Sequence, residues 1–316
     1  MDNVTKCLRS ISDKELCYSE EGIRLINLAQ EMIARERQVV LQEKNILIAG
    51  CYIDMVDDNT INAFATKYDN EYYIFVNRGI VDAHRSYLES LNWSFINNEE
   101  EKKEYIQSLL EYGFYFIVFH EYAHILCGHI DAELDSPDDL KAQEYEADIF
   151  SFDYLLKYIQ YTKELDEYTK EFEKLFLAVY LLMERSQKKE YREWYNDKII
   201  QNYYDEDRKN KRNHPLNAQR ILYLYEMLNV VIVTDKVYLL PVKEKIIEKL
   251  IKIKGLNKNN ITSLGNNYKI VEDSLKELKQ TLDSIREKIP RMGNQINDQI
   301  NNNWVEKGHN YGIIRP

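Results

Sequence analysis

Residues 114–124 have the sequence Phe-Tyr-Phe-Ile-Val-Phe-His-Glu-Tyr-Ala-His, six aromatic or aliphatic side chains followed by two histidines four positions apart. A charged stretch from Glu99 precedes this run, and the pattern predicts one long helix over 99–129 whose second half enters the protein centre. Side chains four residues apart share a helix face, so His120 and His124 can bind one ion. Glu121 lies about 100° further round the helix, where it can reach a water on that ion but not become a third ligand.

A His-Glu-x-x-His pattern also arises by chance, and the histidines would then be ordinary core residues. However, burying two histidines and a glutamate without partners costs roughly 1–3 kcal/mol each. The expected burial of this helix therefore favours a bound ion.

A second pair of side chains four positions apart, Glu144 and Asp148, begins twenty residues after His124, within a helical pattern over 140–158. We predict Glu144 as the third metal ligand and Asp148 as the acceptor of the second N–H of His120 or His124. Taken alone, this stretch is also explained by an exposed acidic helix. Three protein ligands and an open fourth position are typical of a catalytic zinc site, so we predict one Zn²⁺ per chain.

Such a site can hydrolyse amides. The ion polarises a carbonyl and lowers the pKa of its bound water, and Glu121 acts as the general base that passes the proton to the leaving amine. We therefore predict a zinc-dependent endopeptidase that acts on cytoplasmic proteins, and the sequence alone leaves another hydrolysis open. The alternative from a different class is a regulatory or binding protein that keeps the fold without proteolytic activity.

The composition limits the partners and the compartment. With 44% hydrophobic and 30% charged residues the chain is an ordinary globular protein, and its net charge of −11 argues against nucleic acid as the main partner. The longest apolar stretches, 114–130 and 230–242, are interrupted before the roughly 20 residues that a membrane span needs. No secretory signal is recognised, so we expect a cytoplasmic protein with reduced thiols. The four cysteines are Cys7, Cys17, Cys51 and Cys127.

The expected fold class is α+β and mainly helical, with a small antiparallel sheet beside the active-site helix. We divide the chain into an N-terminal helical region (1–45), a zincin-like metallopeptidase domain (46–255), and a C-terminal helix with a polar tail (256–316). Helices are predicted over 19–44, 99–129, 140–158, 163–185, 216–229, 242–254 and 268–289, and strands over 46–53, 60–65 and 72–77. Heptad-like apolar positions in the last helix suit pairing with a partner or with a second copy of the chain.

Five pieces of the chain, in order, resemble the gluzincin metallopeptidases, most of all the HtpX and CAAX-prenyl-protease type, across residues 46–228. The resemblance implies a zincin-like fold and zinc-dependent proteolysis. The five pieces are Ile61-Asn62-Ala63-Phe64-Ala65, residues 74–80, residues 120–129, residues 144–148, and His214-Pro215 with Arg220-Ile221.

The resemblance also assigns roles to further residues. Asn62 and Ala63 would lie on an edge strand along which a substrate peptide binds, and His214 or Arg220 would hydrogen-bond the oxyanion. A helix-cap region and a surface salt bridge are equally good explanations of His214 and Arg220.

The chain departs from the HtpX type, whose members are usually membrane-embedded and carry a long insert before the glutamate ligand. The short spacing here is also similar to the ImmA/IrrE group and to Lit-type phage-exclusion peptidases. Stress response, regulation and phage defence are thus all open as pathways.

Three other histidines receive no role in the predicted site. His129 does not have the spacing of a third histidine ligand, and we expect it at the helix end, where it satisfies nearby carbonyls after Gly128 in a positive-φ conformation. His84 and His309 have no partner at a recognisable spacing and are expected on the surface.

Overall fold

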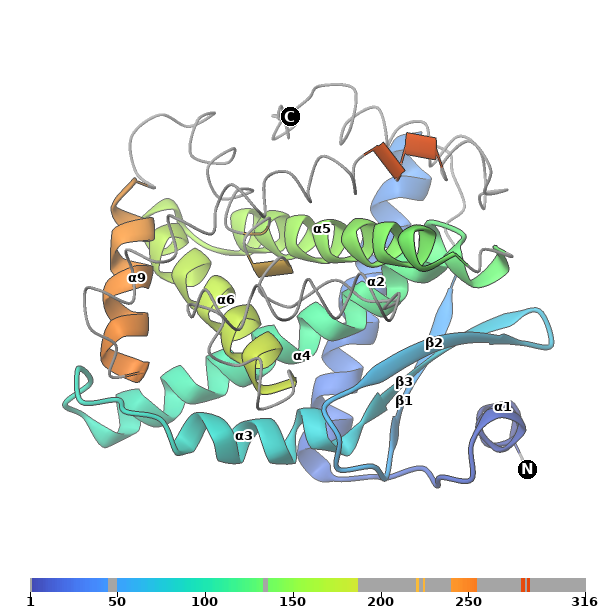
Figure 1. The fold of residues 1–316 in the computed structure, drawn as a ribbon, viewed down its shortest axis with the longest axis horizontal. Coiled ribbons are helices and arrows are strands. Elements are labelled where there is room, and N and C mark those ends of the chain that lie inside the picture. Colours follow the sequence, from blue (N-terminus) through green and yellow to red (C-terminus); the bar gives the residue numbers. More distant parts are fainter. Residues whose placement is uncertain are drawn as a thin grey trace.

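The computed structural model describes residues 2–44, 50–132, 136–186 and 240–254, together with 220, 221, 224, 280, 281, 283 and 284. Figure 1 shows helices packed around a long central helix, with a small sheet on one side. The α+β, mainly helical class predicted from the sequence is confirmed. The helices are α1 (Asn3–Ile11), α2 (Glu20–Lys44), α3 (Asp82–Glu89), α4 (Glu99–Leu126), α5 (Pro137–Thr162), α6 (Leu165–Ser186) and α9 (Leu240–Lys254), with short 3₁₀ turns η1 (Arg78–Ile80) and η2 (His129–Asp131).

Helix α4 carries the two histidines, and both of its ends have a local cause. It begins at Glu99, as predicted, because the Asn98 side chain accepts hydrogen bonds from the backbone N–H groups of Glu100 and Glu101, at 2.8 and 3.2 Å. It ends at Leu126, three residues before the predicted end, because the chain turns at Gly128, where φ is 75°. The positive φ predicted for Gly128 is confirmed.

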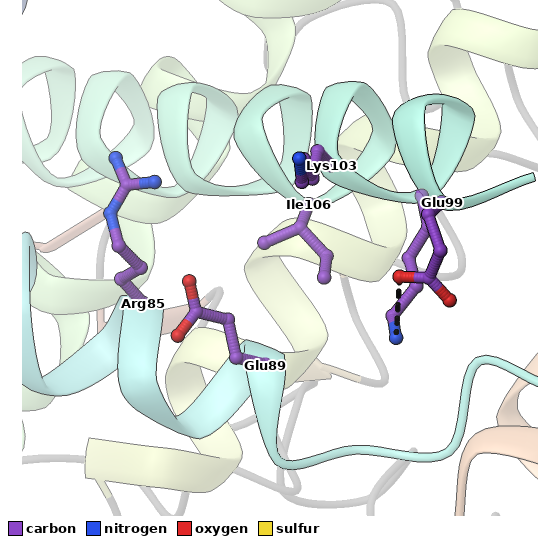
Figure 2. A pocket seen from close by; sticks show the side chains of 6 residues that line it. Arg85, Glu89, Glu99, Lys103 and Ile106 are labelled. Carbon is purple, nitrogen blue, oxygen red and sulfur yellow. Dashed lines mark ion pairs between the residues drawn. The ribbon is translucent and has the colours of Figure 1, made fainter.

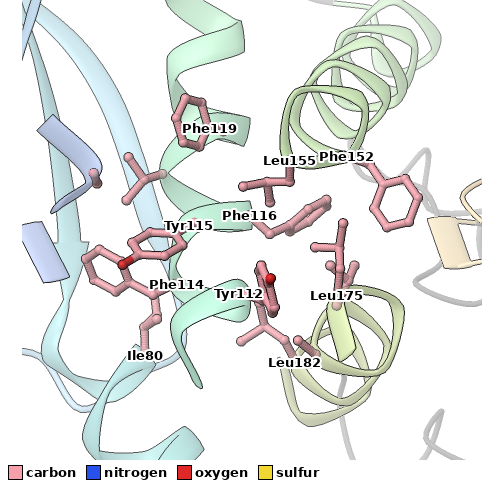
Figure 3. Packing of buried hydrophobic residues seen from close by; sticks show 14 of the residues in the cluster. Ile80, Tyr112, Phe114, Tyr115, Phe116, Phe119, Phe152, Leu155, Leu175 and Leu182 are labelled. Carbon is pink, nitrogen blue, oxygen red and sulfur yellow. The ribbon is translucent and has the colours of Figure 1, made fainter. Parts of the chain in front are cut away.

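The second half of α4 is the centre of the main hydrophobic core. Figure 3 shows Phe114 on the side of Ile80 and the sheet, and Phe116 on the side of α5 and α6. The helix contacts α5, α6 and β2, so its apolar run is buried on both faces. Among the described helices, α4 included, none is both long and apolar enough to cross a membrane.

The sheet contains β1 (Cys51–Val56), β2 (Ala63–Tyr68) and β3 (Glu71–Asn77) in the order β1-β3-β2. Strands β2 and β3 form an antiparallel hairpin whose two turn residues, Asp69 and Asn70, both have positive φ, as a type I′ turn requires. Strand β1 instead pairs with β3 in parallel. The sheet is therefore mixed and not wholly antiparallel, and β2 is the edge strand that lies beside α4.

Helix α2 packs on the core through buried side chains that include Leu25, Ala29 and Ile33. It contacts both β1 and α4. The predicted boundaries after residues 45 and 255 lie at the margins of segments outside the described residues, so the division into three regions stays a prediction. The predicted helices 216–229 and 268–289 are described only at a few positions, which are helical.

Gly79 packs against the backbone of Asn59 and Thr60, just before β2, so closely that the structure has no room for a side chain there. A Cβ at this position would lie 2.4 Å from backbone atoms of Asn59 and Thr60, which cannot move like the end of a side chain. We expect Gly79→Ala to lower the free energy of unfolding by about 1–3 kcal/mol, measured by urea denaturation.

The matched control is Gly113→Ala in the middle of α4, where the nearest heavy atom would be 3.5 Å from the new Cβ. Removing a glycine from a helix interior should stabilise the protein by up to about 1 kcal/mol. Equal effects of the two substitutions would contradict the close-approach explanation.

A surface pocket between α3 and the first turns of α4 is lined by residues of mixed charge, including Arg85, Glu89 and Lys103 (Figure 2). Both acidic and basic side chains line it, and Glu99 pairs with Lys102 at 3.6 Å. The pocket lies about 20 Å along the helix axis from His120. It therefore has no part in the site described next.

Candidate metal centre

Helices α4 and α5 bring the three predicted ligands together at their interface. The Nε2 atoms of His120 and His124 are 3.2 Å apart. The carboxylate of Glu144 reaches both rings, with Oε2 3.4 Å from Nε2 of His120 and Oε1 3.5 Å from Nε2 of His124. The structure therefore brings the three predicted ligands together, each with one ligand atom within 4.8 Å of the others.

The spacing of these atoms fits a zinc ion. Zinc bonds to nitrogen and oxygen of about 2.0–2.2 Å place the ligands of a tetrahedral site roughly 3.3–3.5 Å apart. The two imidazole nitrogens are 3.2 Å apart, and the nearest Glu144 oxygen is 3.4 Å from one of them and 3.5 Å from the other, Oε2 in the first case and Oε1 in the second, so each distance lies within about 0.1 Å of this range. The donor set of two imidazoles and one carboxylate is also one that catalytic zinc sites use.

Asp148, the predicted support of a ligand histidine, contacts His120. Its Oδ1 lies 2.9 Å from Nδ1 of His120, which leaves Nε2 of that ring directed at Glu144. The Asp148 side chain is fully buried, and the Arg220 guanidinium pairs with both of its oxygens, at 2.6 and 2.7 Å. In a metal centre this contact would orient the ring of His120, and the pairing with Arg220 compensates a buried charge.

Arg220 is therefore part of a buried ion pair and not of a surface salt bridge. Its guanidinium is engaged by Asp148 and lies 3.9 Å from Oε2 of Glu144. The role of Arg220 as an oxyanion donor stays a prediction. His214, the other predicted donor, lies outside the described residues.

The two candidate ligand histidines have opposite electrostatic environments. Burial alone would lower the pKa of His120, but the carboxylates of Asp148 and Glu144 raise it to about 10. Burial dominates at His124 and lowers its pKa well below the usual value. The carboxylates around His120 thus favour its protonated form, whereas burial favours the neutral form of His124, so a metal that binds here competes with a proton on His120.

Glu121, the predicted base, lies between the metal centre and the sheet. Its carboxyl accepts a hydrogen bond from the backbone N–H of Ala65 in β2. Burial raises the pKa of Glu121 to about 7, and the Glu144 charge acts in the same direction. A carboxyl with this pKa can both accept and release a proton near neutral pH.

The substrate-side residues predicted from the resemblance lie at the start of the edge strand. Asn62 directly precedes β2 and is exposed, whereas Ala63 is its first residue and is buried. The Asn62 carbonyl accepts the N–H of Asn77 at 3.0 Å, so it faces β3 and not the free edge. Substrate binding by either residue stays a prediction.

His129 and Glu146 adjoin the centre, and sequence reasoning missed both. Nδ1 of His129 is 2.9 Å from Nδ1 of His124, and its Nε2 is 3.0 Å from Oε2 of Glu146. The expectation that His129 satisfies helix-end carbonyls was wrong, because the turn at Gly128 directs its ring back toward His124. The one hint in the sequence was the Gly128-His129 pair, four and five residues after His124.

A family model described as Peptidase U49 matches residues 16–231, more than half of the chain. The chain belongs to the peptidase U49 family. This confirms the predicted peptidase class in its general form, and the match contains every residue of the centre described above. It is not a match to the HtpX, CAAX-prenyl-protease or ImmA/IrrE types. Comparisons of this peptidase with curated proteins and with solved structures found no match.

Proposed function

We propose that this peptidase is a zinc-dependent endopeptidase. The observation that carries the proposal is the convergence of His120, His124 and Glu144, whose ligand atoms are separated by 3.2–3.5 Å. Glu121 follows His120 directly in the sequence, and its carboxyl interacts electrostatically with His120 and Glu144, so a proton acceptor lies close to the ion-binding atoms. Ligand spacing and an adjacent base together support hydrolysis and not a purely structural site.

The ion would act as a Lewis acid that polarises the scissile carbonyl and makes water a better nucleophile. Glu121 would accept a proton from the attacking water and return it to the leaving nitrogen. Asp148 and Arg220 would keep the His120 ring in place during turnover. Buried surroundings would strengthen each of these interactions, because little water competes with them.

The edge strand supports an extended peptide as substrate. Because the backbone groups of Asn62 face β3, the alternation along a strand directs those of Ala63, Ala65 and Lys67 to the free edge. The hydrogen bond from Ala65 to Glu121 agrees with this assignment. A peptide that adds to this edge as a further strand would pass beside the general base, with backbone contacts that tolerate many sequences.

Removing the metal tests the proposal. We expect chelation with 1,10-phenanthroline to abolish cleavage of an unfolded protein such as casein, and added Zn²⁺, but not Mg²⁺, to restore it. Full cleavage by protein shown to be metal-free would refute zinc dependence. One bound zinc per chain without cleavage of any substrate would instead favour the binding-protein alternative.

The physiological substrates are open to direct identification. New protein termini in cells that make the wild type, compared with cells that make Glu121→Gln, would report cleaved cytoplasmic proteins. Termini that occur equally in both cells would not come from this site. Partner binding or self-association through residues 268–289 stays a separate prediction.

A further inference from the structure

His129 and Glu146 form a hydrogen-bonded chain that continues outward from the candidate ligand His124. The first hydrogen bond joins Nδ1 of His124 to Nδ1 of His129 at 2.9 Å. The second joins Nε2 of His129 to Oε2 of Glu146 at 3.0 Å. Both side chains are buried, with 1% of His129 and 6% of Glu146 exposed. Neither residue has a role in the peptide hydrolysis proposed above.

For neutral imidazole rings, counting protons along this series of hydrogen bonds gives the donor and the acceptor of each bond. A carboxylate only accepts, so Nε2 of His129 carries a hydrogen and donates to Glu146. A neutral His129 then has a lone pair on Nδ1, and Nδ1 of His124 must be the donor between the two rings. His124 is left with its lone pair on Nε2, which is the atom that faces His120 and Glu144.

We propose that His129 and Glu146 are positioning residues that hold His124 in the tautomer able to bind a metal. The proposal rests on the metal centre proposed above and adds its outer support. His120 already has such support in Asp148, at 2.9 Å from its Nδ1. The two imidazole ligands would thus each be oriented by a buried carboxylate, directly for His120 and through a second imidazole for His124.

The segment that carries His129 is itself anchored to the sheet. Asp131, two residues later in η2, accepts hydrogen bonds from Lys67 at 2.8 Å and from the Tyr72 hydroxyl at 2.6 Å. Gly128 provides the left-handed turn that returns the chain toward α4. The backbone is therefore fixed both before and after His129, as a positioning residue requires.

The same side chains offer a competing explanation, a second cation held by Cys127, His129 and Glu146, whose ligand atoms lie within 4.8 Å of one another. A cation on Nε2 of His129 would move the hydrogen of that ring to Nδ1. His129 would then donate to Nδ1 of His124, and the hydrogen of His124 would move to Nε2. Neutral rings cannot serve both sites, so a second cation would displace the first.

Zinc affinity, measured by chelator competition on folded full-length variants, tests the proposal. We expect His129→Phe to weaken zinc binding about 10- to 100-fold, because the apolar ring cannot accept from His124. His129→Asn should recover part of the affinity, since its amide oxygen can take the place of Nδ1. Glu146→Gln should weaken binding less than His129→Phe. The matched control is Cys127→Ala, which should leave both affinity and stoichiometry unchanged.

A second measurement needs no metal and separates this proposal from the zinc site. Long-range ¹H–¹⁵N spectra of the metal-free protein should show the hydrogen of His124 on Nδ1 in the wild type and in His129→Asn, but a mixture of tautomers in His129→Phe. Unchanged zinc affinity in His129→Phe, or two zinc ions that fall to one in Cys127→Ala, would overturn the proposal. If the wild type binds no zinc, the proposed function fails, and a hydrogen on Nε2 of His124 would overturn the positioning role as well.

Discussion

Glu121→Gln is expected to lower the rate of peptide hydrolysis by about 10²–10⁴-fold while one zinc stays bound per chain. The amide cannot accept the proton of the attacking water, yet its oxygen can still accept the hydrogen bond from Ala65. The substitution does not touch the proposed ligands His120, His124 and Glu144, so metal binding should persist. Values of kcat/KM and zinc content from the same preparation measure both halves of the prediction.

Glu104→Gln is the matched control, since Glu104 is an exposed carboxylate on the same helix α4. It should leave both hydrolysis and zinc content unchanged. If Glu121→Gln retained full activity, Glu121 would be removed from the mechanism. If it lost both activity and zinc, the residue would have to be treated as part of the metal site.

Arg220→Met is expected to destabilise the fold by about 3–5 kcal/mol, measured by urea denaturation. The substitution leaves the Asp148 carboxylate, whose side chain is 0% exposed, without the cation that pairs with both of its oxygens. The Arg220 charge lowers the pKa of Asp148 against the effect of burial, and this compensation would be lost.

A comparison with Arg78 separates this effect from that of removing any arginine. Arg78 pairs with Asp57 and Asp82, whose side chains are 58% and 45% exposed, so Arg78→Met should cost about 1 kcal/mol or less. The double variant Arg220→Met with Asp148→Asn should recover part of the loss, because no buried charge is left unpaired. Equal costs for Arg220→Met and Arg78→Met would contradict the buried pair.

The local parts of the fold could be predicted from the sequence. The start of α4 at Glu99 follows from a capping side chain one residue earlier, and the β2–β3 hairpin follows from a run of turn residues between two apolar stretches. Each of these two features is determined by residues that lie only a few positions apart in the sequence. The parallel pairing of β1 with β3 was missed, because its partner strand is not the next one in the sequence and no turn encodes it.

The candidate site also has some parts that local sequence predicts and others that only the tertiary packing determines. The pairs His120 with His124 and Glu144 with Asp148 follow from helix periodicity, and the structure brings them together. His129 meets Glu146 only through the turn after α4 and the packing of α5, which no spacing encodes. His84, expected on the surface for lack of a partner, is fully buried beside Gly113, so a missing motif partner does not indicate exposure.

Anomalous diffraction at the zinc edge, from crystals of the protein loaded with Zn²⁺, tests the central claim most directly. We predict one strong peak per chain, within about 2.0–2.2 Å of Nε2 of His120, Nε2 of His124 and a carboxylate oxygen of Glu144. A peak among Cys127, His129 and Glu146, or no peak in protein that hydrolyses peptides, would contradict the account.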